Sequence, residues 1–100
     1  MRLSKSQIEI IDHLAKKHFG TMTTVYLFGS RTDENKKGGD IDLFISNDNE
    51  DMLTIDAKVQ FLAELKKNIG DRKIDVVFDN ANCREKKTFY RSINQNKVKL

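Results

Sequence analysis

The sequence predicts one α/β (α+β) domain, in which a small mixed central sheet is flanked by helices in the order αββαβα. Apolar residues recur at helical spacing in three segments, and three short runs rich in β-branched and aromatic residues lie between them. The 100 residues contain no proline and no shift of composition that would mark a linker. Residues 1–100 are therefore expected to form a single domain.

The first part of the chain is expected to form a helix followed by two strands. Ser4 and Gln7 have the spacing of a capping box, and the helical periodicity that follows them ends at Gly20. The predicted apolar face of this helix comprises Ile8, Ile11, Leu14 or Ala15, and Phe19. Residues 23–28 and 40–45 have the composition of buried strands. The polar segment between these strands, over residues 30–39, is predicted to be a loop.

The second part is expected to add a helix, a strand and a last helix. A polar turn over residues 46–51 leads into a long helix that ends at Gly70. Its predicted apolar face comprises Ile55, Val59, Leu62 and Ile69. Residues 73–78 predict a third short strand, and residues 83–94 predict the last helix.

Composition restricts the class of protein. No apolar stretch approaches the roughly 20 residues that span a bilayer, and the start of the chain lacks the apolar core of a secretory signal. We therefore expect a soluble, cytoplasmic protein with no membrane association. Cys83 is the single cysteine, which excludes an internal disulfide, and His13 and His18 do not have zinc-site spacing with it. We interpret these three residues as structural or incidental.

The net charge of +3 is concentrated at the end of the chain, where residues 81–100 hold six basic residues and one acidic residue. Such a cluster is most often a solvated helix face, and an acidic protein partner and RNA or DNA are the alternatives. The basic residues are not interleaved with aromatic residues in a recognised motif. Nucleic acid is therefore the partner that the sequence favours least.

Three aspartates are predicted to share one face of the sheet. Asp40 and Asp42 point to the same side of their strand, because successive side chains alternate. Two neighbouring carboxylates repel each other unless a cation lies between them, and Mg²⁺ prefers carboxylate oxygens. Asp75 interrupts the apolar third strand, where a lone charge is unfavourable, so it can join the pair. Considered alone, Asp-x-Asp also occurs as a solvated edge or a helix cap.

A phosphate-binding turn is predicted where the first strand ends. Gly29 permits a tight turn whose following N–H groups can face an anion, and the Ser30 hydroxyl is a further donor. An ordinary turn with a helix cap is the alternative when the pair is considered singly. Together with three carboxylates from two strands, the turn fits two-metal phosphoryl or nucleotidyl transfer.

The string LFGSRTDENKKGGDIDLFI, followed by KIDVVF, resembles the minimal nucleotidyltransferases (MNT) of the DNA polymerase β superfamily. The signature of that family is an apolar-Gly-Ser turn, a loop of about this length, Asp-x-Asp and a carboxylate on a later strand. The resemblance is strongest over residues 25–45 and 73–78. Arg31 follows the serine as in many members and is a candidate phosphate contact, with solvent exposure as the alternative.

The resemblance implies a role for each of the other motif residues. Asp40 and Asp42 would coordinate the Mg²⁺ bound to the triphosphate, and Gly29 and Ser30 would hold its phosphates. Asp75 would complete a two-metal site and help to deprotonate the acceptor hydroxyl. The expected reaction transfers NMP, most simply AMP from ATP, to a hydroxyl and releases pyrophosphate.

The acceptor is expected to come from another molecule, because so short a chain is nearly all catalytic core. Proteins similar to this one are commonly partnered with a small all-helical HEPN-type protein in prokaryotic toxin–antitoxin pairs. There the transferase acts as antitoxin by adding AMP to a toxin tyrosine. The last helix, with Phe89, Tyr90 and Ile93, is a candidate docking surface, and sealing the domain's own core is the other role considered for it.

The alternative function of the whole protein is that of a non-catalytic module, which neutralises its partner by contact while its nucleotide site is idle. A homodimer or a hetero-oligomer is compatible with either function.

Overall fold

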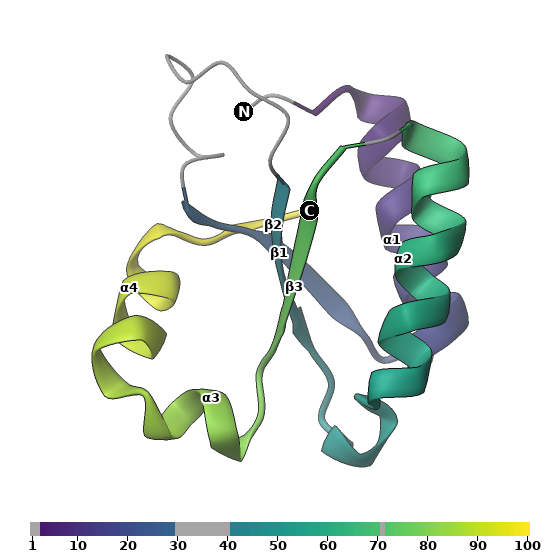
Figure 1. The fold of residues 1–100 in the computed structure, drawn as a ribbon. Helices are drawn as coiled ribbons and strands as arrows, with labels where there is room; N and C mark the ends of the chain where they lie inside the picture. Colours follow the sequence, from purple (N-terminus) through teal and green to yellow (C-terminus); the bar gives the residue numbers. More distant parts are fainter. Residues whose placement is uncertain (1–2, 30–40, 71) are drawn as a thin grey trace.

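The computed structural model describes residues 3–29, 41–70 and 72–100. The predicted loop and three predicted site residues, Ser30, Arg31 and Asp40, lie outside these ranges. The described residues form three layers, with α1 and α2 on one face of a sheet and α3 and α4 on the other (Figure 1). The predicted α/β architecture is confirmed. None of the described helices is long and apolar enough to cross a membrane.

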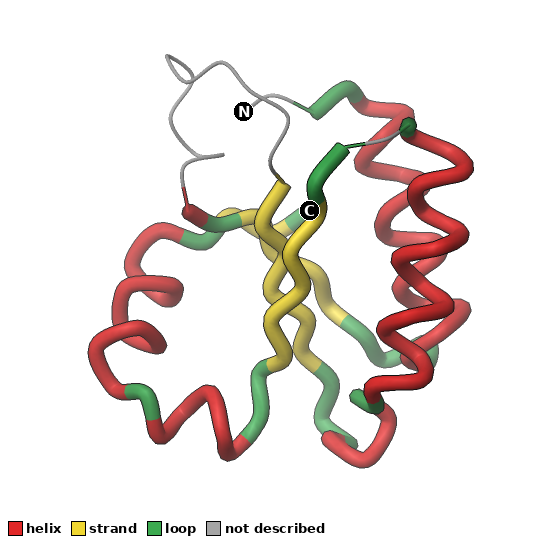
Figure 2. The backbone as a smooth tube through the Cα atoms, viewed as in Figure 1, coloured by secondary structure: helices red, strands yellow, loops and turns green. Residues whose placement is uncertain are grey.

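The elements follow the predicted order with three differences: a 3-10 helix at the end of the predicted polar turn, a last helix in two parts, and a fourth strand (Figure 2). In chain order they are α1 (Lys5–Phe19), β1 (Thr24–Leu27), β2 (Ile41–Ser46), the 3-10 helix η2 (Glu50–Met52), α2 (Ile55–Ile69), β3 (Ile74–Phe78), α3 (Ala81–Glu85), α4 (Lys87–Asn96) and β4 (Val98–Lys99). The predicted last helix is divided in two, because Lys86 leaves the helical region with ψ 74°. The short strand β4 was not predicted.

The described part of the sheet has four strands in the order β3-β2-β1-β4. β1 pairs antiparallel with both β2 and β4, whereas β2 and β3 are parallel. Parallel neighbours need a long crossover connection, and α2 provides it. β3 is consequently an edge strand of the described sheet.

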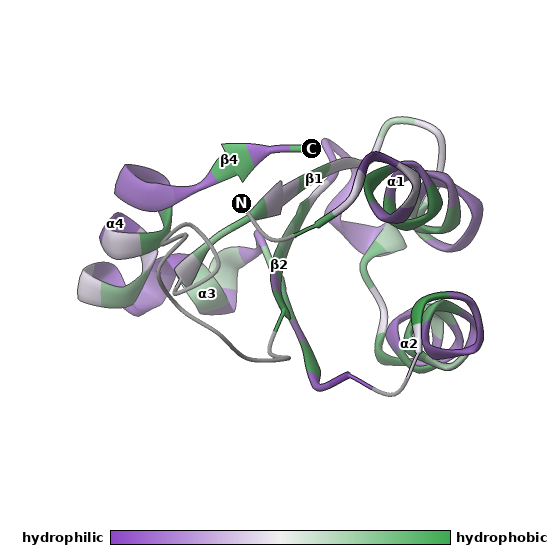
Figure 3. Ribbon diagram, turned by 90° about the horizontal axis from the view of Figure 1, so that it is seen from above, coloured by the Kyte–Doolittle hydropathy of each residue, from purple (hydrophilic) through white to green (hydrophobic). Residues whose placement is uncertain are grey.

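The larger core lies between the sheet and the pair α1 and α2, which lie on the same side of the strands (Figure 3). Ser4 and Gln7 form the predicted capping box at the start of α1. The buried residues of α1 are Ile11, Leu14, Ala15 and Phe19, which confirms most of the predicted face. The rings of Phe19 and Phe61 lie 5.3 Å apart and join the two helices.

The predicted apolar face of α2 is wrong in its first half. Ile55 and Val59 are 68% and 60% exposed, whereas Phe61 and Leu65 are fully buried. Phe61 and Leu65 are one helical turn apart, and it is this side of α2 that packs against α1 and the sheet. The sequence pattern fits both faces, and only the orientation of the helix on the sheet distinguishes them.

A smaller core lies between the sheet and the last two helices. Its buried residues are Phe28, Phe44, Cys83 and Ile93, and Tyr26, Val77 and Tyr90 pack against it. Ile93 is therefore used to seal the domain, the second of the two roles considered for it. β4 continues from α4 along β1, and the Lys97 ammonium lies 4.3 Å from the centre of the Tyr26 ring.

Candidate active site

Asp42 in β2 and Asp75 in β3 lie directly opposite each other in the parallel strand pair. Their neighbours Ile41 and Ile74 belong to the larger core, so the two carboxylates lie on the other face of the sheet, the face of α3 and α4. This is the arrangement that strand alternation predicts. Asp40, the third predicted carboxylate, lies outside the described residues.

The turn after β1 lies directly against Asp42. Gly29 has a φ of 70°, and a Cβ built there would lie 2.7 Å from Oδ2 of Asp42. The Phe28 N–H donates to the backbone carbonyl of Asp42 over 3.1 Å. A side chain at position 29 would therefore overlap the carboxylate, which explains why glycine is needed there.

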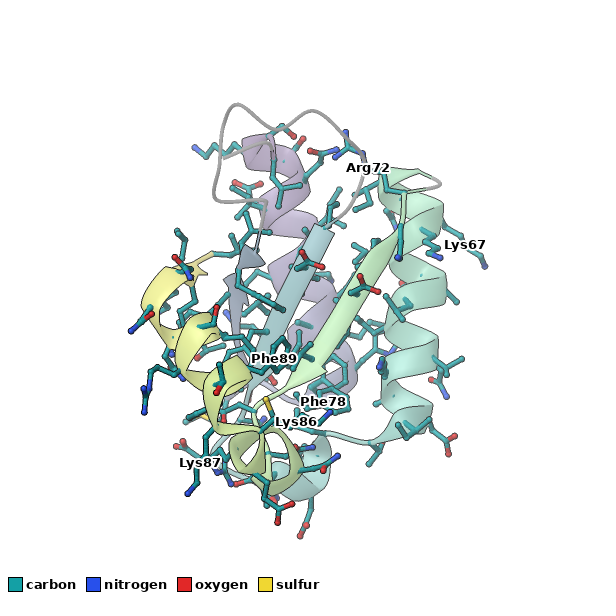
Figure 4. The ribbon with its side chains drawn as sticks, turned by 60° about the vertical axis from the view of Figure 1, so that its left-hand side comes forward. Lys67, Arg72, Phe78, Lys86, Lys87 and Phe89 are labelled. Carbon is teal, nitrogen blue, oxygen red and sulfur yellow. The ribbon has the colours of Figure 1, made fainter. Side chains whose placement is uncertain are left out.

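A cleft of about 630 Å³ includes both carboxylates and extends along the edge strand β3. It is lined by Phe28, Asp42, Lys58, Leu62, Ile74, Asp75, Val76, Val77 and Phe89. Phe89 lies on the side of α4 that faces β3 (Figure 4). Phe78, at the end of β3, lines a neighbouring pocket together with Phe89. The cleft therefore has a carboxylate end at the strand starts and an apolar part bounded by α4.

The two carboxylates fit a divalent cation. The Asp75 side chain is exposed, and within the described part of the chain no hydrogen bond or ion pair to it is found. Two carboxylates at adjacent in-register positions supply the hard oxygen donors that Mg²⁺ prefers. Among the described residues, no group of three or more His, Cys, Asp or Glu side chains converges on one point. A third carboxylate ligand, for which Asp40 is the predicted residue, would have to come from outside the described residues.

Lys58 and Phe89 were not predicted to be residues of this site. Lys58 is on α2 and Phe89 is on α4, and both are distant in sequence from the Gly-Ser and Asp-x-Asp motifs. Neither residue belongs to a sequence motif that is typical of catalysis or ligand binding. An exposed aromatic residue in an amphipathic helix was the only available signal, and it does not specify a cleft.

The two histidines and the cysteine are outside this cleft. His18 Nε2 lies 2.8 Å from Glu64 Oε1, and the Lys17 ammonium donates to the same carboxylate. These hydrogen bonds, first that of Lys17 and then that of His18, lower the pKa of Glu64. Burial raises the pKa of the Cys83 thiol, which lies in the smaller core. The structural interpretation of His18 and Cys83 agrees with these positions.

Paired carboxylates beside a glycine turn, on one face of a small mixed sheet, are the arrangement expected of a phosphoryl-transfer domain. The sequence matches the family described as "Polymerase beta, Nucleotidyltransferase" over residues 9–100. The chain belongs to this polymerase β-like nucleotidyltransferase family. No curated protein matches the sequence at a significant level. The superfamily predicted from the motifs is confirmed.

Proposed function

We propose that this protein is a Mg²⁺-dependent nucleotidyltransferase that moves AMP from ATP to a hydroxyl group. The observation that carries the proposal is the in-register pair Asp42 and Asp75 beside the Gly29 turn, in a chain of this family. The proposal includes the predicted roles of Ser30 and Arg31 as phosphate contacts and of Asp40 as the third metal ligand.

The reaction is an in-line displacement at the α-phosphorus. The acceptor oxygen forms a bond to that phosphorus, the bond to the bridging oxygen of the pyrophosphate breaks, and pyrophosphate leaves with the electron pair. Mg²⁺ would neutralise the charge on the phosphate oxygens. Asp42 and Asp75 would hold the ion, and the exposed carboxylate of Asp75 would accept the proton of the acceptor hydroxyl.

We further propose that the acceptor is a tyrosine of a small helical HEPN-type partner, which makes this chain the antitoxin of a prokaryotic pair. Lys86, between α3 and α4, and Lys87 and Arg91, on α4, are exposed and suit an acidic partner surface. Because Ile93 is buried, the docking surface would consist of these cations and not of the apolar side of α4. A cytoplasmic location, where ATP is available, is part of this proposal.

The experiment incubates the co-purified complex of chain and partner with Mg²⁺ and α-labelled ATP and looks for label on protein. We expect label on a partner tyrosine with the wild type and at least a hundredfold less with Asp42→Asn or Asp75→Asn. Asp48→Asn is the matched control, because Asp48 is an exposed aspartate in the turn after β2 and does not line the cleft. This control should label like the wild type.

Two results would reject the enzymatic proposal. One is an intact complex that transfers no label, and the other is undiminished labelling by Asp42→Asn. If the complex nevertheless protects against the partner's toxicity, the alternative function applies, namely neutralisation by contact with an idle nucleotide site.

A further inference from the structure

We propose that Phe89 is a stacking platform for the nucleobase, so that the site selects purine nucleoside triphosphates by ring stacking and not by reading the base edge. The inference depends on the proposed function, because it assigns the base end of the same nucleotide. It concerns the apolar part of the cleft beside Phe89, to which neither motif of the sequence assigns a role.

Phe89 packs against the domain and is still partly exposed. Its side chain is 43% exposed, yet its ring makes a T-shaped contact with the Phe28 ring at a centroid distance of 6.3 Å. It lines the same cleft as Asp42 and Asp75. One part of the ring is therefore held by the domain, and the rest is open to the cleft.

The contacts of Phe28 and α4 fix the ring relative to the carboxylates. Phe28 is 8% exposed, and its N–H is hydrogen-bonded to the carbonyl of Asp42. The next residue of α4, Tyr90, packs its ring 6.2 Å from that of Phe44, and Ile93 one turn later is buried. Because Tyr90 and Ile93 anchor α4 in the turn that follows Phe89, the Phe89 ring is preorganised, and little entropy is lost when a base stacks on it.

The order of residues along β3 matches the order of groups in a nucleotide. Asp75 and Val77 lie on the same face, and two residues of strand span about 6.6 Å. Val77 lines the cleft and packs against the smaller core, which includes Phe28. A triphosphate bound at Asp75 would therefore place its sugar and base over Val77, next to Phe89.

The lining of this part of the cleft offers stacking and few hydrogen bonds. Apart from the two aspartates, Lys58 supplies the one polar side chain among the described lining residues, and its ammonium lies 6.0 Å from the centre of the Phe78 ring. Stacking on an aromatic ring tolerates different bases, since every base has a π-face, and purines have the larger one. We therefore expect ATP and GTP to bind similarly and UTP to bind more weakly.

The test compares the Kd values of Mg-ATP, Mg-GTP, Mg-UTP and Mg-tripolyphosphate by calorimetry for three proteins. Phe89→Leu keeps an apolar side chain against Phe28 but removes the ring, and Phe89→Tyr keeps the ring. Phe89→Leu should weaken Mg-ATP about tenfold, equivalent to about 1.4 kcal/mol, and change Mg-tripolyphosphate less than about twofold. Phe89→Tyr should bind both within about twofold of the wild type. Thermal melting of each variant establishes that it is folded.

Comparing Mg-ATP with Mg-tripolyphosphate distinguishes a failure of this inference from a failure of the proposed function. If the folded wild type binds neither ATP nor tripolyphosphate with Mg²⁺, the proposed function and the inference are both overturned. If the wild type binds both ligands and Phe89→Leu weakens neither, or weakens both equally, only the inference is overturned. Equal affinity of the wild type for Mg-UTP and Mg-ATP would overturn the purine preference.

Discussion

A Cβ at position 29 would lie 2.7 Å from Oδ2 of Asp42, closer than a carbon and an oxygen that are not bonded approach each other in folded proteins. Gly29 also has a φ of 70°, which L side chains rarely adopt. The conformation of the turn and the position of the Asp42 carboxylate therefore depend on each other, because the Gly29 backbone lies directly against that carboxylate.

Gly29→Ala should impair the binding of Mg-ATP while the protein still folds. The left-handed backbone would cost about 1–2 kcal/mol, and the methyl group would displace the Asp42 carboxylate. We expect the variant to fold with a lower Tm and to lose most of the rise in Tm that Mg-ATP gives the wild type. The measurement is thermal melting with and without Mg-ATP.

Gly70→Ala is the matched control for that change. Gly70 also has a positive φ, 97°, but a Cβ there would meet nothing within 4 Å. The Gly70→Ala variant should lose a similar amount of folding free energy, since such backbone strain costs about 1–3 kcal/mol. Its Tm should still rise with Mg-ATP as much as that of the wild type. An undiminished ligand shift in Gly29→Ala would show that the turn does not constrain Asp42.

Asp75→Asn should leave the stability of the unliganded protein nearly unchanged. The Asp75 side chain is exposed, and the substitution removes a charge next to that of Asp42. We expect the free energy of unfolding to change by less than about 0.5 kcal/mol without metal. The stabilisation by Mg²⁺ with ATP should be lost. A large loss of stability without metal, measured by urea denaturation, would instead indicate a structural role.

The geometry of the carboxylates could be predicted because it depends on local rules. Strand alternation places Asp42 and Asp75 on a face opposite to Ile41 and Ile74, and the parallel register then brings the two carboxylates together. The start of α1 was equally predictable, because capping by Ser4 involves residues only three positions apart.

The features that could not be predicted depend on contacts between distant segments. Which side of α2 is buried is decided by Phe19 of α1, whose ring packs against Phe61. β4 is a strand only because β1 offers it a free edge, and its own residues include an exposed lysine. Phe89 joins the cleft because α4 folds back over the sheet, so no pattern near the motifs indicates it.

Phe61→Ala should be among the more destabilising single changes in this chain. Its side chain is fully buried between α1 and the sheet, and Phe→Ala substitutions at such positions cost about 3–5 kcal/mol. Val59→Ala, two residues earlier but 60% exposed, should cost less than about 0.5 kcal/mol. Urea denaturation of both variants measures the difference. Equal losses would mean that the Val59 side of α2 is covered in solution.

Glu64 should make stability depend on acid pH. Its carboxylate accepts from Lys17 over 2.9 Å and lies 2.8 Å from His18 Nε2, which links α1 to α2. These hydrogen bonds lower the pKa of Glu64 in the folded protein below its ordinary value of 4.5. The folded state thus binds this proton less readily than the unfolded state. The contribution of Glu64 is complete above the ordinary pKa and is lost as the pH falls through the lowered one.

Glu64→Gln tests this linkage. The Tm of the variant should lie below that of the wild type at about pH 7, and the difference should shrink toward about pH 3. High salt should also reduce it, because Glu64 is partly exposed and exposed charges are screened. Glu85→Gln, at an exposed glutamate of α3, is the matched control and should follow the wild type. A difference between wild type and Glu64→Gln that stays constant with pH would mean that the ionisation of Glu64 does not contribute to the stability of the helix pair.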